Sequence, residues 1–268
     1  MLFERIVSGI IGVIALIIII NLVSARLFSV FVNVIALISF HEYFSAIFKK
    51  NKRIIKIILS ILGVGFIFIT FNFNDVEINM MYIILSFILI IFVYIIKYQK
   101  VNFSEITYSF FGFIYIFVLL SYAVLMRSMN NGILILWYTL ISVWVNDTLA
   151  YFIGLKYGKR KLIPNISPNK TVEGSLGGLL GSITISIIFL KYNYPNLPLL
   201  IDVFIGLIIG VSAQTGDLAA SIIKRHSGIK DFSKIIPGHG GIIDRLDSIL
   251  FAVPIIYYII CILDALKI

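Results

Sequence analysis

Long runs of apolar residues, separated by short polar connections, make up most of this chain. Nine of these runs come close to the ~20 residues that an α-helix needs to cross the hydrocarbon core of a bilayer. They lie at roughly residues 6–23, 27–48, 54–71, 80–96, 106–126, 133–154, 174–190, 197–221 and 248–266. The pattern therefore predicts an all-α, polytopic integral membrane protein with about nine transmembrane helices.

The composition supports the same fold class. The 268 residues are 60% hydrophobic and only 13% charged, whereas a soluble domain is roughly half apolar and about a quarter charged. A soluble globular domain is therefore excluded. A disulfide-stabilised fold is excluded too, because the chain has a single cysteine.

Lysine and arginine residues indicate the orientation of the helices, because basic residues of short loops stay on the cytoplasmic side. With a cytoplasmic N-terminus, the cytoplasmic segments hold 18 of the 22 basic residues. The opposite side keeps Arg26, Arg127, Lys191 and Lys267. We therefore predict an N-terminus inside and a C-terminus outside. This bias, with attraction to anionic lipid, accounts for the net charge of +9 without a nucleic-acid partner.

Polar residues divide the chain into two regions. Residues 1–126, with spans one to five, are predicted to be an N-terminal transmembrane scaffold. Residues 127–268 are predicted to be a C-terminal catalytic region, in which cytoplasmic loops 155–173 and 222–247 join spans six to nine. One polar pair, His41-Glu42, interrupts the scaffold near the end of span two. We interpret it first as a hydrogen-bonding or anchoring pair at the membrane boundary, with a role in a site as the alternative.

Ionisable groups fall inside the apolar helices of the second region. Asn146 and Asp147 interrupt span six, and Asp217 lies seven residues before Lys224, which is ~10 Å deeper along a helix. A charge at membrane depth costs at least a few kcal/mol unless it faces a wet cavity, a cation or a partner. Asp217 is therefore a candidate site residue. For both acids, the alternative is a carboxylate that a neighbouring helix neutralises.

The spacing of the acids indicates that their oxygens point in common directions. Asp217 and Ser221 are four residues apart, and Asp244 and Asp247 are three apart at the start of the last helix, so each pair shares a helix face. If those faces meet, their oxygens converge. Such donors suit Mg²⁺, which uses one or two carboxylates with water and substrate phosphate. Zinc is not indicated, because the chain has only three histidines and one cysteine.

The loops near these acids have features of phosphate-binding segments. The sequence PGHGG at 237–241 can turn sharply and expose successive backbone N–H groups. Lys170 lies beside a predicted helix start, where backbone donors also point at anions. The basic residues of loop 222–247 could hold polyanions as well. The alternatives are a simple helix cap at Lys170 and an ordinary basic cytoplasmic loop.

Together these stretches resemble the signature of the phosphatidate cytidylyltransferases, also called CDP-diacylglycerol synthases: S-x-x-K-R, then K-D, then H-G-G-x-x-D-R-x-D. The matching residues are Ser221, Lys224, Arg225, Lys230, Asp231, Pro237, Gly238, His239, Gly240, Gly241, Asp244, Arg245 and Asp247. The resemblance extends to Asn146-Asp147, 154–161, 167–174 and Gly216-Asp217. It covers about the C-terminal half, since the first five spans match only in hydropathy.

The resemblance implies an Mg²⁺-dependent transfer in which phosphatidic acid attacks CTP and yields CDP-diacylglycerol and pyrophosphate. It also implies a homodimer, and it leaves open a second, monovalent cation. We predict Asp217 and Asp244 as metal ligands, with Ser221 and Asp247 beside them as further catalytic residues. The predicted substrate-binding residues are Asp147, Lys170, Lys224, Arg225, Lys230, Gly238, His239, Gly240, Gly241 and Arg245. Arg245 could instead pair with Asp231 or Asp217.

Other functions are weighed against this one. A CTP-dependent enzyme acting on another lipid, such as a CDP-archaeol synthase or a polyprenol kinase, is the nearest alternative. A secondary transporter would also carry intramembrane acids near glycine-interrupted helices, but it has no need for a dense signature loop. A structural scaffold would leave the buried acids unexplained. The chain has no obvious organelle address, which favours a bacterial cytoplasmic membrane with the site facing the cytoplasm.

Glycines recur in spans seven and eight at spacings that let helices approach closely. They are Gly174, Gly177, Gly178, Gly181, Gly206 and Gly210. We expect them to pack helices within one chain in preference to forming a dimer seam.

Overall fold

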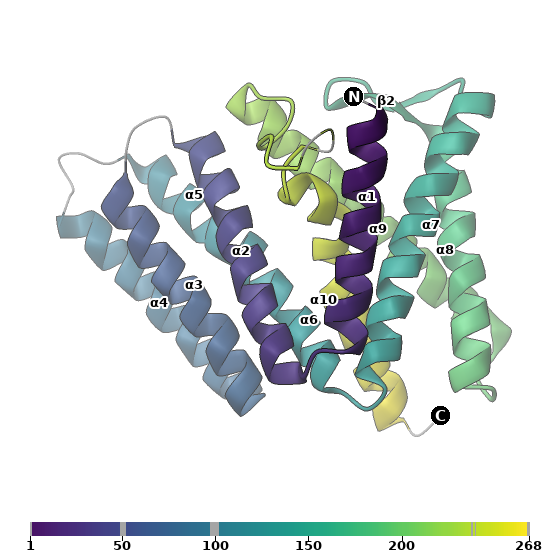
Figure 1. The fold of residues 1–268 in the computed structure, drawn as a ribbon, viewed down its shortest axis with the longest axis horizontal. Coiled ribbons are helices and arrows are strands. Elements are labelled where there is room, and N and C mark those ends of the chain that lie inside the picture. Colours follow the sequence, from purple (N-terminus) through teal and green to yellow (C-terminus); the bar gives the residue numbers. More distant parts are fainter. Residues whose placement is uncertain (1, 49–51, 97–101, 237, 239, 267–268) are drawn as a thin grey trace. The chain divides into compact units, whose positions relative to one another are not determined.

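The structure, a computed structural model, describes residues 2–48, 52–96, 102–236, 238 and 240–266, with the backbone alone for 2–6 (Figure 1). The helices are α1 Leu2–Asn21, α2 Ala25–Ile47, α3 Arg53–Phe73, α4 Val76–Ile96, α5 Phe103–Gly112, η2 Phe113–Val118, α6 Leu119–Ser128, α7 Gly132–Tyr157, α8 Val172–Asn193, α9 Leu199–Ser227 and α10 Ile243–Ala265. The two strands are β1 Lys161–Ile163 and β2 Ser167–Thr171.

The helices confirm the predicted all-α, polytopic membrane fold. Within the described residues, eight helical stretches are long and apolar enough to cross a bilayer, and α1 adds a shorter apolar stretch at Val7–Asn21. Helices α5 and α6, joined by the π-helical turn η2, form one span over Phe103–Ser128. The direction in which the helices cross the membrane stays a prediction.

Helix α9 ends later, and helix α10 begins earlier, than hydropathy predicted. Helix α9 continues past the predicted end at 221 to Ser227. Three basic residues in its last turn stabilise this extension, because positive charge interacts favourably with the negative end of the helix dipole. Gly228 then ends the helix in the left-handed conformation, with φ 70°. Helix α10 begins at Ile243 rather than at 248. The predicted loop 222–247 is therefore reduced to residues 228–242.

The chain packs as two compact units, which are described separately. The first unit consists of Met1–Asn130 and Ile229–Arg245. In it, α2 packs against α3 and α6, and α4 packs against α3. Its interior is rich in aromatic rings, such as the contact between buried Phe40 and Phe117 with 5.2 Å between centroids. Tyr43 of α2 donates its hydroxyl to the carbonyl of Tyr108 at 2.8 Å, which fixes α2 against α5.

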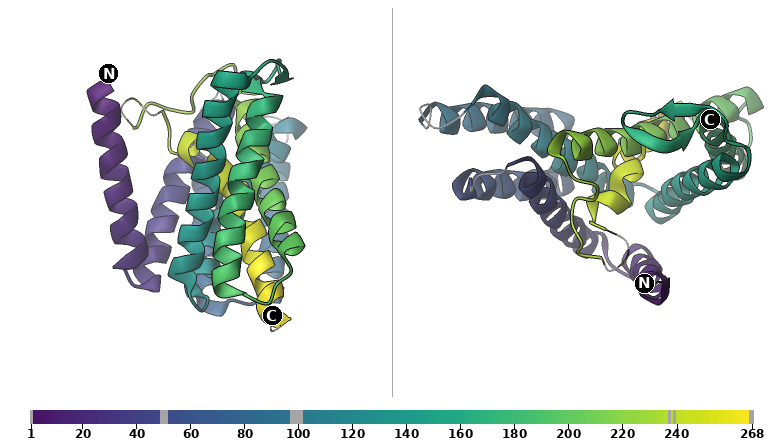
Figure 2. Two further views of the ribbon diagram at one scale, coloured as in Figure 1. Left: turned by 90° about the vertical axis from the view of Figure 1, so that its right-hand side faces the viewer. Right: turned by 90° about the horizontal axis from the view of Figure 1, so that it is seen from above.

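The second unit consists of Asn131–Gly228 and Leu246–Ile268. Helices α7, α8 and α9 lie side by side in it (Figure 2). The glycines of α8 face α7: the position that a Cβ on Gly178 would take lies 2.8 Å from the carbonyl oxygen of Asn146. Gly206 and Gly210 of α9 lie equally close to α8. The glycine pattern thus packs helices within the chain, as predicted.

Strands β1 and β2 form an antiparallel hairpin between α7 and α8, where sequence reasoning predicted only a loop. The hairpin turns through Pro164-Asn165, a dipeptide that favours turns. It ends where Thr171 caps α8 by accepting a hydrogen bond from the Gly174 amide at 3.1 Å. The hairpin therefore holds Lys170, the last residue before this cap, in a defined place.

The two packing units do not coincide with the predicted regions 1–126 and 127–268. Residues 229–242, here called the signature loop, pack with the first unit together with the start of α10. The predicted division into a scaffold and a catalytic region concerns function, and it stays a prediction.

Candidate functional site

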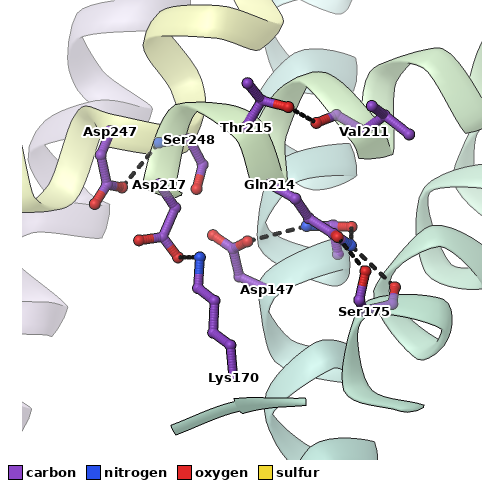
Figure 3. A network of polar contacts seen from close by, with 10 residues as sticks. Asp147, Lys170, Ser175, Val211, Gln214, Thr215, Asp217, Asp247 and Ser248 are labelled. Atoms are coloured by element: carbon purple, nitrogen blue, oxygen red, sulfur yellow. Dashed lines mark hydrogen bonds and ion pairs between the residues drawn. The ribbon is translucent and has the colours of Figure 1, made fainter. Parts of the chain in front are cut away.

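Three acids from three helices of the second unit lie together beside a lysine. Figure 3 shows Asp147 of α7, Asp217 of α9 and Asp247 of α10, here called the carboxylate cluster, with Lys170 of β2. The Lys170 ammonium nitrogen lies 2.5 Å from Oδ2 of Asp217. The charge of Asp217 also acts on both Asp147 and Asp247. The structure thus brings together four residues that the sequence singled out separately.

The face of α9 explains how Asp217 is presented. Gln214, Asp217 and Ser221 are spaced at i, i+3 and i+7, so they follow one side of the helix. Ser221 is buried, with 8% of its surface exposed, whereas the Asp217 side chain is 32% exposed. Asp217 can therefore be reached by ligands, and Ser221 lies one turn away from it.

A glycine sets the distance between α9 and α10. A Cβ on Gly216 would lie 2.3 Å from the carbonyl oxygen of Asp247, closer than real atoms approach. Only a residue without a side chain allows the two helices to come this near. Because Gly216 precedes Asp217, the same approach brings the Asp247 side chain beside it.

A partly buried network of polar side chains lies beside the carboxylate cluster. Asn146, fully buried, donates to Oδ1 of Asp147 at 3.1 Å and accepts from Nε2 of Gln214 at 3.1 Å. Gln214 also bonds Ser175 of α8 through two contacts, of 2.5 and 3.0 Å. Sequence reasoning missed Gln214 and Ser175. The signal was present, since Gln214 is an amide in an apolar helix one turn before Asp217.

The basic end of α9 lies close to the same residues. Lys224 interacts electrostatically with Asp247. Arg225 donates from Nε to the carbonyl oxygen of Ile166 at 3.2 Å, which ties the end of α9 to the turn of the hairpin. Lys224 and Arg225 both lie in the last two turns of α9, about two turns past Asp217.

Asp244 lies in the first turn of α10, in the first unit. Backbone amides of the signature loop hold its carboxylate. Its Oδ2 accepts hydrogen bonds from the amides of Phe232 at 2.9 Å and Gly241 at 3.0 Å. Gly240 adopts the left-handed conformation with φ 84°, which a side chain would strain. The Gly241 amide was predicted to bind phosphate, and in the structure it donates to Asp244.

Glu42 of α2 anchors this loop. It is 2% exposed and accepts three hydrogen bonds, from the Ser233 hydroxyl at 2.5 Å and from the amides of Ile242 and Ile243 at 3.0 Å each. Glu42 is thus a hydrogen-bonding residue, as the first interpretation expected, while its place at the membrane boundary stays a prediction. Its neighbour His41 is exposed and contacts Lys56.

The remaining predicted residues are less constrained. Lys230, Gly238 and Arg245 are exposed. His239 lies outside the described residues, so its role in binding phosphate stays a prediction. Asp217 and Asp244 belong to different units, and the predicted meeting of their carboxylates stays a prediction.

The carboxylate cluster has the donor chemistry that Mg²⁺ prefers. Its ligands would be hard carboxylate oxygens, and the ammonium of Lys170 already accompanies Asp217 as a positive charge. In the part of the chain that the structure describes, no three histidine, cysteine or acidic residues are close enough to hold a metal ion by themselves. Mg²⁺ does not require this, since it completes its shell with water and substrate phosphate. The residues therefore fit Mg²⁺ in kind.

Comparison with known proteins extends over nearly the whole chain. Residues 3–263 match the model of the cytidylyltransferase family. A phosphatidate cytidylyltransferase of Bacillus subtilis is 41% identical over 148 residues, which are 55% of this chain and 55% of that protein. One of Staphylococcus haemolyticus is 43% identical over 127 residues, or 47% of this chain and 49% of the relative. The matched segments thus span about half the length of these relatives.

Proposed function

We propose that this chain, which belongs to the cytidylyltransferase family, transfers the cytidylyl group of CTP to phosphatidate and releases pyrophosphate. The product would be CDP-diacylglycerol. The observation that carries the proposal is the carboxylate cluster beside Lys170, a site of mixed charge on helices that are apolar enough to cross a membrane. The activity in the names of the two relatives supports the same reaction.

The proposed reaction is an in-line displacement at phosphorus. An oxygen of the phosphatidate phosphate forms a bond to the α-phosphorus of CTP. The bond from that phosphorus to the oxygen that bridges the α- and β-phosphorus atoms breaks, so pyrophosphate leaves with the electron pair. The attacking oxygen is already anionic near neutral pH, so no strong general base is needed. The residues of the chain would act by holding the two substrates in line and by neutralising charge.

Basic side chains around the carboxylate cluster would bind the phosphate oxygens. Lys170 is held at the site by Asp217 and the hairpin, and Lys224 lies close enough to interact with Asp247. Each can donate to a phosphate oxygen as a charged group, which makes a stronger hydrogen bond than a neutral donor. Asp217 would keep the Lys170 ammonium in place when the substrates are absent.

Mg²⁺ is part of the proposal, with Asp217 as its first ligand and Asp244 as the second ligand predicted from the sequence. Bound there, the ion would neutralise charge on the phosphates of CTP. We further propose that the site faces the cytoplasm of a bacterial cell. Such a position lets CTP arrive from water while the phosphatidate headgroup stays at the membrane surface.

The test is the substitution of each acid by its uncharged isostere. Asp217→Asn and Asp244→Asn should each lower CTP-dependent formation of labelled lipid in membranes by roughly 10²–10³-fold, the range for removing one transition-state contact. The matched control is Asp75→Asn, an exposed acid whose Oδ1 accepts from the Ile78 amide at 3.0 Å. Asparagine caps a helix equally well, so the control should behave as wild type.

The same assay separates the proposed acceptor from the alternatives. Phosphatidate should yield a lipid that contains cytidine, whereas an added polyprenol should yield no product. Full activity of both Asp217→Asn and Asp244→Asn would contradict the assignment of these acids, and a product made only from polyprenol would contradict the proposed reaction.

A further inference from the structure

We propose that Glu42 is a positioning residue, which holds the signature loop and the start of α10 in the conformation that directs the Asp244 carboxylate. Glu42, the signature loop and Asp244 all belong to the first unit. This role of Glu42 rests on the proposed function only in that Asp244 is taken to serve the transfer reaction.

Two of the three hydrogen bonds of Glu42 come from backbone amides at the start of α10, which would otherwise lack an acceptor. The first amides of a helix have no partner within the helix, and a side chain just before it usually caps them. At α10 the acceptor comes instead from α2, about 200 positions earlier in the chain. Oε1 takes the amide of Ile242 and Oε2 takes that of Ile243, each at 3.0 Å. The carboxylate thus fixes two successive amides in direction as well as in position.

The contacts of Glu42 are continuous with those of Asp244. The Gly241 amide donates to Oδ2 of Asp244, and the next two amides donate to Glu42. A Cβ on Gly241 would lie 2.6 Å from Oε2 of Glu42, so the backbone of the loop rests directly on the carboxylate. Any shift of Glu42 would therefore move the amide that holds Asp244.

Helix α2 is itself a firm support for Glu42. The adjacent Tyr43 is 1% exposed and bonds the carbonyl of Tyr108 at 2.8 Å. Its ring fills the space beside Gly112, where a Cβ would lie 2.3 Å from the ring. This packing restrains the backbone of α2 next to Glu42. The Glu42 carboxylate therefore has a fixed position relative to the rest of the helix.

A charge at a buried position has an energetic cost that a space-filling residue would avoid. Glutamine could fill the same volume, but its amide nitrogen is a donor and would face an N–H group of Ile242 or Ile243. Only a carboxylate accepts from all three donors at once. This requirement explains why the position carries an acid, and it provides a substitution with almost no change in shape.

The first measurement is hydrogen exchange of the purified full-length protein in detergent, followed at the amides of Ile242 and Ile243. Glu42→Gln should accelerate their exchange by about tenfold or more, because a hydrogen bond to a charged group is lost. His41→Ala is the matched control, since His41 is adjacent to Glu42, is exposed and contacts Lys56 of α3. Unchanged exchange in Glu42→Gln would overturn the proposal.

The second measurement is the Mg²⁺ dependence of lipid cytidylylation. Glu42→Gln should raise the Mg²⁺ concentration for half-maximal rate by about tenfold, with the rate largely restored at saturating Mg²⁺. A merely structural role would reduce the amount of active enzyme and leave the half-maximal concentration unchanged. Faster exchange without this shift would therefore overturn the positioning role.

Ser233→Ala provides a second test of the proposal if the Glu42→Gln protein does not accumulate in the cell. It removes one of the three donors to Glu42, so it should shift both measurements in the same direction by a smaller factor. The double variant should show less than the product of the two effects, since both act on one network. No shift in Ser233→Ala would contradict the proposal.

A wild-type protein that makes no cytidine-containing lipid would contradict the proposed function instead. The exchange measurement would still decide whether Glu42 holds the start of α10.

Discussion

The ion pair of Lys170 with Asp217 contributes little to the stability of the fold. The two side chains are 26% and 32% exposed, so water and salt screen their attraction, and pairs in such settings contribute about 0–1 kcal/mol to folding. The 2.5 Å separation nevertheless places a cation beside the carboxylate of Asp217. A phosphate group that arrives there meets a charged donor whose position is already set.

Replacement of Lys170 by methionine should weaken CTP binding. The loss of a hydrogen bond to a charged phosphate costs about 1.5–3 kcal/mol, which corresponds to a rise in the KM for CTP of roughly 10- to 150-fold. The measurement is the CTP dependence of labelled lipid formation. Lys161→Met is the matched control, because Lys161 is an exposed lysine in the same hairpin. Equal KM values in the two variants would contradict the role of Lys170.

At the scale of the helices, the approach of α9 to α10 decides where the acids lie. The contact at Gly216 leaves no room for a methyl group, since its nearest neighbour would be a backbone oxygen of Asp247 at 2.3 Å. A backbone atom of a helix cannot move aside as a flexible side chain can. A larger residue must therefore separate the helices, and the carboxylate of Asp247 must move with its helix.

Gly216→Ala should lower both stability and activity. Overpacking of this kind costs about 1–3 kcal/mol, which should appear as a reduced Tm in detergent and as a lower kcat in the lipid assay. Gly12→Ala serves as the control, because a Cβ on Gly12 of α1 meets nothing within 4 Å and alanine favours the helix over glycine. A Gly216→Ala variant as stable and active as Gly12→Ala would contradict the close contact between α9 and α10 at this position.

The elements of this fold were largely predictable from sequence, and their contacts were not. Hydropathy located the membrane helices, and helical spacing placed Asp217 and Ser221 on one face. The hairpin escaped notice because its strands are only three and five residues long, too short for an alternating pattern. The contact of Glu42 with Ile242 joins positions 200 residues apart. Such a contact depends on how helices pack, which a single sequence does not reveal.

At the scale of the whole molecule, the distribution of basic residues predicts which ends of the helices face the cytoplasm. Helix α8 has 22 residues, so it is ~33 Å long and matches the ~30 Å hydrocarbon core. Lys159 precedes it in the hairpin segment, and Tyr192, 82% exposed, lies at its far end. These two positions should therefore be on opposite sides of the membrane.

Cysteine labelling tests this orientation. In a Cys261→Ser background expressed in intact bacteria, an impermeant maleimide should label Tyr192→Cys from outside. Lys159→Cys should be labelled only after the membrane is permeabilised, because the positive-inside rule predicts that the hairpin lies in the cytoplasm. The reverse pattern would contradict the predicted orientation and the proposed cytoplasmic site.

The long-range contact of Glu42 has a consequence for chimeric proteins. The residues of the family signature all lie in the C-terminal half of the chain, which suggests at first that foreign helices could replace the N-terminal ones freely. The three donors that meet Glu42 indicate otherwise, since an apolar substitute would leave them without an acceptor at this position. A hybrid built from two relatives would need an acidic residue at this one place in its borrowed half.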